Sequence, residues 1–194
     1  MNRIEKIYYF FEIEQFEECL DQCNLIISNK SDSIFHYYAY FYKGKVEYEF
    51  GEFEKSINSY EKSLTLNSNE DQIWVSMACA LELIGEKKLA LNSFIKEIRY
   101  FPKNAFGWQK LAGFLTRIKR FKLAKKIFDN VSANDEIDYT VCASEYAVAL
   151  YEAGNLKEEL QYYDKLRAMG YNETWIEDNY NELLSEIHRA DNSC

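Results

Sequence analysis

The chain has 194 residues, of which 47% are hydrophobic and 28% are charged, a composition typical of soluble proteins. Its single Pro and seven Gly argue against an all-β architecture and against flexible linkers between domains. The formal net charge of −9 disfavours nucleic-acid binding through phosphate neutralisation, unless basic residues gather in one patch.

Acidic residues interrupt the apolar N-terminal segment at Glu5, Glu12 and Glu14, which is not the pattern of a secretory signal. No uncharged apolar run approaches the roughly 18 residues that a membrane helix needs. The five Cys form neither a zinc-binding spacing nor a CxxC pair, and their odd number favours reduced thiols. We therefore expect a cytoplasmic protein without a metal site, another cofactor or membrane contact.

Residues 2–33 predict a first pair of helices, because apolar residues recur at helical spacing up to Phe11 and again from Phe16. Cys19 and Cys23 lie one turn apart on the same face of the second helix. They could supply two ligands to a metal ion, but no further ligand lies nearby in the sequence. We therefore interpret them as small buried residues between helices.

Residues 37–70 and 71–104 predict the second and third pairs, after a polar connection over residues 28–36. In the third pair, one apolar run ends at Gly85 and the next ends just before Pro102, which cannot continue a helix. Each helix then has a single apolar face, and a hairpin of two such helices cannot bury both faces alone. It must stack on copies of itself.

Residues 105–138 predict a fourth pair, because the pattern repeats after 34 residues. At this spacing Trp74 is followed by Trp108, and Phe94 by Phe128. The same shift relates Gly44, Ala78 and Ala112, then Gly51, Gly85 and Lys119 at the turn, and then Ser56, Ala90 and Ala124.

Residues 140–172 predict a fifth pair if one residue is inserted before it, with Gly154 at the turn. Thr174 and Glu177 then have the spacing of a capping box and open a last helix over residues 174–190. One face of this helix is apolar and the other is polar. We therefore expect it to cap the end of the stack.

The order of a Trp, a small residue, a Gly, a second small residue, an aromatic residue and a Pro within 34 residues resembles the tetratricopeptide repeat (TPR) family. The resemblance implies an all-α fold, a right-handed α-solenoid of about five helix hairpins with a C-terminal capping helix. It implies one domain over residues 1–194. It also implies that the first helix of each hairpin lines a concave groove in which ligands lie.

The positions that map to the exposed inner face of this groove are rich in aromatic residues toward the N-terminus. Tyr and Phe offer a large contact area at low entropic cost, which suits a binding site. The alternative is that these rings fill seams between neighbouring first helices. The expected partner-binding residues are Tyr8, Phe11, Tyr38, Phe41, Tyr42, Lys45, Tyr48, Val75, Cys79, Phe106, Lys110 and Arg117.

The residue types that catalysis needs do not converge in this sequence. The two His, His36 and His188, lie at opposite ends of the chain, and there is no glycine-rich phosphate loop. The Asp and Glu residues are spread at helical spacing, which is typical of a solvated face. We therefore expect no enzyme activity.

These observations favour a protein–protein interaction module or adaptor that binds a peptide or a partner helix in the groove. Two alternatives remain open: a holding chaperone similar to the small TPR chaperones of bacterial secretion systems, and a structural scaffold subunit that self-associates. A basic run from Arg117 to Lys126 could dock an acidic partner or nucleic acid. A solvated outer helix face is the favoured interpretation of this run, so nucleic acid is not an expected partner.

Overall fold

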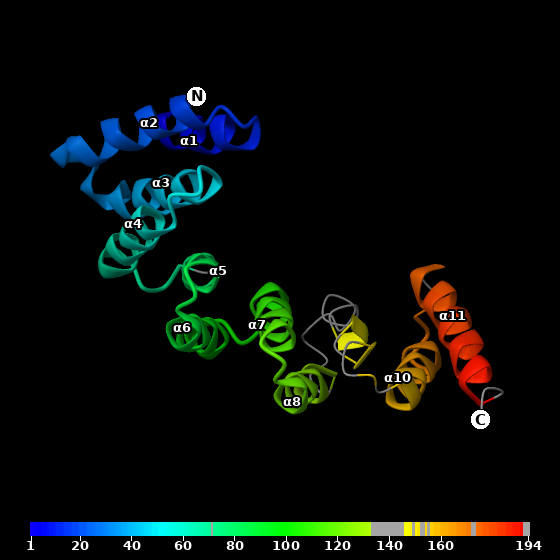
Figure 1. Ribbon diagram of the computed structural model, residues 1–194. Coiled ribbons are helices and arrows are strands. Elements are labelled where there is room, and N and C mark those ends of the chain that lie inside the picture. The colour runs from blue at the N-terminus through cyan, green and yellow to red at the C-terminus, as the bar shows by residue number, and fades with distance from the viewer. Residues whose placement is uncertain are drawn as a thin grey trace. The chain divides into compact units, whose positions relative to one another are not determined.

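The computed structural model describes residues 1–70, 72–132, 146–148, 150–151, 154, 156–171 and 174–191. All regular secondary structure in these ranges is helical, which confirms the all-α fold (Figure 1). The chain divides into two compact units, Met1–Gly107 and Trp108–Cys194, and each is described by itself. A single domain over the whole chain stays a prediction.

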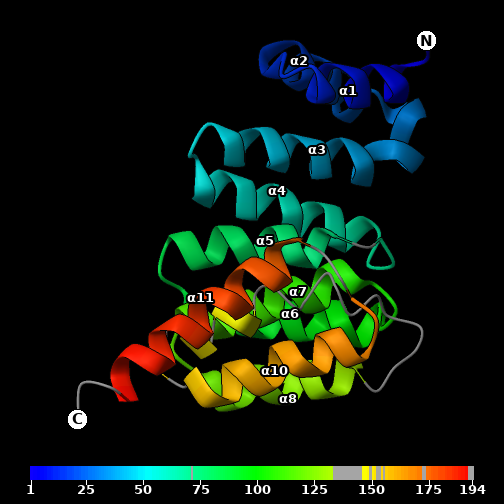
Figure 2. The same cartoon turned by 90° about the vertical axis from the view of Figure 1, so that its right-hand side faces the viewer.

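The first unit consists of three helix pairs that follow one another along the chain. Consecutive helices contact each other, so that the second helix of one pair packs on the first helix of the next (Figures 1 and 2). A 3-10 helix, η1 (Lys30–Phe35), fills the predicted polar connection after the first pair. The helices are α1 (Arg3–Glu12) and α2 (Phe16–Ser28), α3 (His36–Glu49) and α4 (Phe53–Leu66), and α5 (Ile73–Leu83) and α6 (Lys87–Tyr100).

The second unit begins within α7 (Ala105–Arg117) and continues with α8 (Phe121–Ser132), α10 (Leu156–Ala168) and α11 (Thr174–Asp191). Helices α10 and α11 pack together, and Arg167 Nε donates a 2.8 Å hydrogen bond to Glu177 Oε1 across this contact. Helix α11 coincides with the predicted last helix. The first helix of the fifth pair, expected from residue 140, falls largely outside the described residues.

The turn inside each pair has the same backbone conformation. The residue two positions before the second helix has a positive φ, with values of 57° at Glu14, 74° at Gly51, 83° at Gly85, 58° at Lys119 and 67° at Gly154. Gly is favoured in this conformation because it has no Cβ atom. From Gly51 to Lys119 these residues keep the 34-residue spacing, and Gly154 follows with one inserted residue before the fifth pair, whereas Glu14 lies outside this spacing. Glu14 is the turn residue of the first pair, which the sequence did not mark.

The two helices of a pair approach closely, and small side chains allow this approach. A Cβ atom at Gly44 of α3 would lie 2.7 Å from Cε1 of Tyr60 and 3.2 Å from the backbone oxygen of Ser56, both on α4. Tyr60 is itself almost fully buried, so its ring has no room to give way. The residues at the fourth position of the second helices are fully buried in four pairs: Cys19, Ser56, Ala90 and Ala124.

Cys19 and Cys23 are both fully buried, which confirms their interpretation as small packed residues. The Sγ atom of Cys19 donates to the backbone oxygen of Ile7 at 3.5 Å, which joins α2 to α1. A hydrogen bond between the two thiols lowers the pKa of Cys19 and, together with burial, raises the pKa of Cys23. Among the described residues no group of three or more His, Cys, Asp or Glu is placed to hold a metal ion.

Among the described residues, Glu47, Glu97 and Glu159 are buried, so the expectation that the acidic residues form a solvated face is wrong for these positions. Glu47 shows how such burial is tolerated. Its Oε2 accepts a 2.6 Å hydrogen bond from Ser59, and its Oε1 lies 3.1 Å from Lys43 Nζ. These protein partners replace the water that a carboxylate loses on burial.

Glu97 of α6 connects the segments that precede two first helices. Its Oε1 accepts a 3.3 Å hydrogen bond from the backbone N–H of Gln72, before α5, and a 2.9 Å bond from Nδ2 of Asn104, before α7. Asn104 Oδ1 accepts in turn from the N–H of Phe106 at 3.2 Å. A Cβ atom at Gly107 would lie 2.7 Å from Glu97 Cγ, so a small residue is needed there.

The turn residues predict opposite effects of two substitutions. Lys119→Gly should raise the free energy of unfolding by about 0.5–1 kcal/mol, because the left-handed conformation costs a residue with a Cβ atom about 1–2 kcal/mol. Gly85→Ala should lower it by about 1 kcal/mol for the same reason. No heavy atom lies within 4 Å of a Cβ built at Gly85, so the backbone alone is responsible. Denaturant unfolding measures both free-energy changes. Changes of the same sign would show that Lys119 and Gly85 do not share one turn conformation.

The Glu97 hydrogen bonds predict a second stability effect. Glu97→Ala should lower the free energy of unfolding by about 2–3 kcal/mol, because it leaves the N–H of Gln72 and the amide of Asn104 without their acceptor. Glu97→Gln retains an acceptor oxygen and should cost less. Glu61→Ala on the exposed side of α4 is the control, with an expected change within about 0.5 kcal/mol. A Glu97→Ala protein as stable as this control would show that the contact is dispensable.

Candidate functional site

Helix α1 begins at a capping box, which fixes the helix end that borders the candidate site. Asn2 Oδ1 accepts a 2.9 Å hydrogen bond from the Glu5 N–H, and Glu5 Oε2 accepts a 2.9 Å bond from the Asn2 N–H. This reciprocal pair satisfies two donors that a helix N-terminus otherwise leaves open. Ile7 is fully buried on one side of the helix. The opposite side carries side chains that the helix does not use for its own packing.

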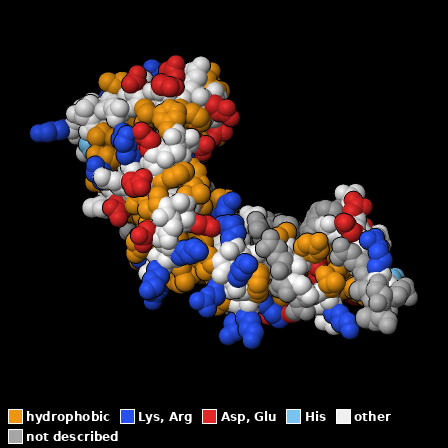
Figure 3. All heavy atoms as spheres, in the orientation of Figure 1, with side chains coloured by type: hydrophobic (Ala, Val, Ile, Leu, Met, Phe, Trp, Pro, Cys, Tyr) orange, Lys and Arg blue, Asp and Glu red, His pale blue; other side chains and the backbone are white. Residues whose placement is uncertain are grey.

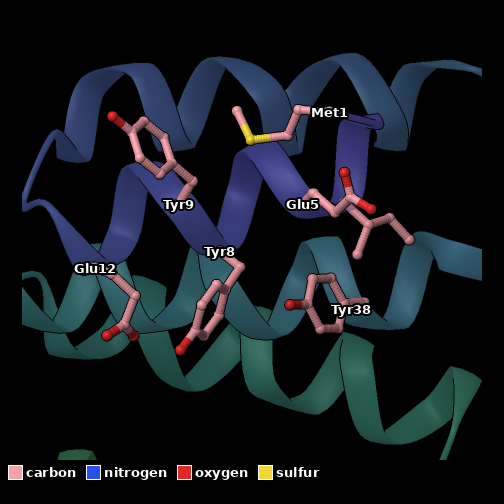
Figure 4. Close-up of a pocket in the computed structure, with 7 residues that line it drawn as sticks. Met1, Glu5, Tyr8, Tyr9, Glu12 and Tyr38 are labelled. Carbon is pink, nitrogen blue, oxygen red and sulfur yellow. The ribbon is translucent and has the colours of Figure 1, made fainter.

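A hollow of about 540 Å³ lies beside α1 and α3. Side chains at four-residue spacing face it in two rows, Ile4–Tyr8–Glu12 of α1 and Glu5–Tyr9 of α1 with Met1 before the helix. Figure 4 shows Tyr8 and Glu12 of α1 and Tyr38 of α3 along the hollow. The lining residues are Met1, Ile4, Glu5, Tyr8, Tyr9, Glu12 and Tyr38.

The hollow combines exposed aromatic surface with carboxylates. Tyr8 is 52% exposed and Tyr9 is 47% exposed, which is high for rings of this size. The Glu5 carboxylate is held by Asn2, with Nδ2 of Asn2 donating to Oε1 at 2.8 Å. Glu12 is exposed at the other end of the row. A side chain entering the hollow therefore meets ring faces, tyrosine hydroxyls and the Glu12 carboxylate.

A cluster of aromatic rings around Lys45 packs between α1 and α3. The Nζ atom of Lys45 lies 4.0 Å from the ring centre of Phe11 and 5.0 Å from that of Tyr42. The two rings also meet edge to face at 5.4 Å. Burial lowers the pKa of Lys45, while the charges of Glu12 and Glu49 oppose this shift. The Lys45 ammonium is thus held by cation–π contacts within the protein.

The expected exposure of Phe41, Tyr42 and Val75 is wrong, because these side chains are only 8%, 7% and 2% exposed. The first helices are in contact, α3 with α1 and with α5, and their facing side chains fill the space between them. Phe41 also reaches Tyr60 of α4 at a ring distance of 6.1 Å. For these three positions the seam alternative describes the packing correctly.

The other predicted binding residues do not form one continuous site. Some lie in the hollow or in the cluster beside it, and the rest lie elsewhere. Tyr8 and Tyr38 line the hollow, and Phe11 and Lys45 belong to the cluster beside it. Tyr48 packs against Phe53 of α4 at a ring distance of 5.4 Å. Cys79 of α5 is half-buried, Phe106 is exposed in the first turn of α7, and later in α7 Lys110 is half-buried and Arg117 is exposed.

Met1, Ile4 and Tyr9 line the hollow, although they were not among the binding residues expected from the sequence. The signal was the four-residue spacing along α1, which puts two adjacent rows of side chains on one face. Aromatic side chains at this spacing were ambiguous, because core and surface rows look alike in a degenerate first repeat.

In the part of the chain that the structure describes, no helix has the length and apolar character to cross a membrane.

Comparisons with protein-family models and with curated proteins find no match to this sequence. Solved structures are similar in fold. A tetratricopeptide repeat protein from Parabacteroides merdae has a TM-score of 0.73 at 16% identity, over 96% of this chain and 72% of that chain. YrrB, described as a TPR protein with an unusual peptide-binding site, has a TM-score of 0.66 at 16% identity, over 96% of this chain and 90% of its own.

A thermophilic TPR protein from Thermus thermophilus gives a similar result, with a TM-score of 0.64 at 12% identity over 94% of this chain and 97% of that chain. At such low identity the likeness shows the fold alone. The fold agrees with the helix pairs, the repeated turn and the buried small residues described above. The resemblance indicated by the 34-residue period is thereby confirmed, and the chain has the fold of tetratricopeptide repeat proteins.

Proposed function

We propose that this chain is a protein-interaction module that binds a peptide segment or a partner helix in the hollow beside α1 and α3. The observation that carries the proposal is the exposed aromatic surface of Tyr8 and Tyr9 next to Tyr38. Exposed rings gain contact area when a partner covers them, and Tyr loses little side-chain entropy in doing so.

The chemistry around the rings supports a ligand with apolar side chains. The capping box holds one end of α1 and the Lys45 cluster fills the adjacent space between α1 and α3, so the lining is preorganised. Preorganised sites avoid the cost of ordering loops on binding. A segment that seats an apolar side chain between Tyr8 and Tyr38 can donate a hydrogen bond to Glu12. The peptide-binding site named for YrrB is consistent with this use of the fold, at the level of analogy.

Peptide selection tests the proposal directly. Peptides selected from a random library on the intact protein should bind the Tyr8→Ser/Tyr9→Ser variant at least about 30-fold more weakly, because paired Tyr contacts are worth about 2 kcal/mol or more. Tyr151→Ser is the matched control, since Tyr151 is 56% exposed and belongs to the second unit, outside the hollow. Circular dichroism should show unchanged helix content in both variants. Selected peptides that bind folded Tyr8→Ser/Tyr9→Ser as tightly as the parent protein would refute binding in the hollow.

Phe41 separates packing from binding in the same region. Phe41→Ala should lower the free energy of unfolding by about 3–5 kcal/mol, as for other buried aromatic residues, because the ring is covered by neighbouring helices. Thermal unfolding measures the change. A Phe41→Ala protein with unchanged stability and lost peptide binding would show that this ring contacts the ligand and does not serve mainly in packing.

A further inference from the structure

The charged residues of this chain are segregated into three blocks. Residues 87–126 contain twelve Lys or Arg and a single acidic residue, a net charge of +11 in a chain of net charge −9. Residues 1–86 carry −9 and residues 127–194 carry −11. The one acidic residue of the basic block is Glu97, whose side chain is fully buried. The surface of this block is therefore basic without an exposed carboxylate of its own.

Two second helices of the basic block present the same exposed pair of side chains. Lys88–Leu89 on α6 and Lys122–Leu123 on α8 are 34 residues apart and occupy equivalent positions. Leu89 is 51% exposed and Leu123 is 44% exposed. The other pairs hold charged residues at the position of this Leu: Glu18, Lys55 and Glu158. The fold therefore does not require an apolar side chain there.

Each of the two helices adds further cations and apolar atoms to this pair. On α6 the exposed residues include Lys96, Arg99 and Ile95, of which Ile95 is 45% exposed. On α8 the exposed residues include Lys126, whereas Lys125 is held by Glu158 at 3.1 Å. Figure 3 shows blue side chains gathered over α6 and over α8, with orange side chains among them.

We propose that the exposed faces of α6 and α8 each bind an acidic amphipathic protein segment. Carboxylates of the segment pair with Lys88 or Lys122, and its aliphatic side chains cover Leu89 or Leu123. Complementary charge selects such a partner, and the aliphatic contact adds affinity that is independent of salt. This proposal does not depend on the hollow beside α1, because it rests on different residues of different helices.

The flanking blocks argue against an extended polyanion. In the first unit the residues other than the basic block, 1–86, carry a net charge of −9, and in the second unit residues 127–194 carry −11. A nucleic-acid duplex or an anionic bilayer extends beyond one helix face, so in either unit it would meet acidic residues that repel it. The apolar residues that recur beside Lys88 and Lys122 are aliphatic, whereas binding to single-stranded nucleic acid relies on aromatic rings that stack on bases. Tyr100 is an exposed ring at the end of α6, but the residue one period later in the sequence is Asn134, so this ring is not part of the repeated pair. A short acidic segment meets the cations and the Leu side chains without this repulsion.

The probe is a fluorescein-labelled 18-residue helical peptide with Glu on one face and Leu on the other, measured by anisotropy with the intact protein. Leu89→Ser/Leu123→Ser and Lys88→Glu/Lys122→Glu should each weaken binding about tenfold or more. The effect of the Lys changes should shrink as salt rises, and that of the Leu changes should persist. Lys157→Glu is the matched control, because Lys157 is exposed at the equivalent position of α10.

Other results would overturn the proposal. These are the absence of peptide binding, equal weakening by Lys157→Glu, or equal binding of a peptide with Ser in place of Leu. Tighter binding of a 20-nucleotide single strand or of phosphatidylserine vesicles would assign the faces to another class of ligand. Sedimentation that shows salt-sensitive self-association, lost in Lys88→Glu/Lys122→Glu, would make a second copy the occupant instead. Because the hollow is tested by Tyr8 and Tyr9, each proposal can fail without the other.

Discussion

The close approach of the two helices in each pair is the constraint on which the rest of the structure depends. A Cβ atom at Gly44 would lie 2.7 Å from the Tyr60 ring. The small residues at the fourth position of four second helices, Cys19, Ser56, Ala90 and Ala124, have no exposed surface. With the helices this close, large side chains such as Phe94 and Phe128 are fully removed from water. Burial of these rings supplies most of the free energy that orders a hairpin too small to fold alone.

Polar contacts then fix how neighbouring helices meet, within a pair and between pairs. Glu97 holds the segments before α5 and α7 through two hydrogen bonds, and Ser63, one period earlier, donates to the backbone oxygen of Tyr37 at 2.7 Å. Apolar packing alone tolerates small sliding between helices, because dispersion contacts have little directionality. A buried hydrogen bond has a defined geometry and loses its energy when the helices shift. Ser63 therefore sets the register within its own pair, and Glu97 sets the register of α6 both with α5 and with the segment that opens the next pair.

The sequence predicted the helix pairs, the turns and the small packed residues of the second to fourth repeats, because their pattern recurs and each copy supports the others. It did not separate exposed from buried aromatic residues. Phe41 and Tyr42 of α3 are buried while Tyr8 of α1 is exposed, although all three fit a helix face with aromatic side chains. The difference arises from contacts of α3 with α1 and α5, which come from segments distant in sequence. Glu97 was missed for the same reason, since its acceptor role depends on residues in two other segments.

The fold leaves its two kinds of helix with different surfaces to use. The first helices pack on one another and on second helices, so Lys45 and Phe41 make their contacts within the protein, whereas Tyr8 and Tyr9 of α1 remain exposed. The second helices keep an outer face at every repeat, where side chains carry little folding energy. A residue such as Leu89 or Leu123 at such a position costs solubility and contributes little to the core. Its repetition beside a Lys, in the one basic block of an acidic chain, therefore points to binding rather than to stability.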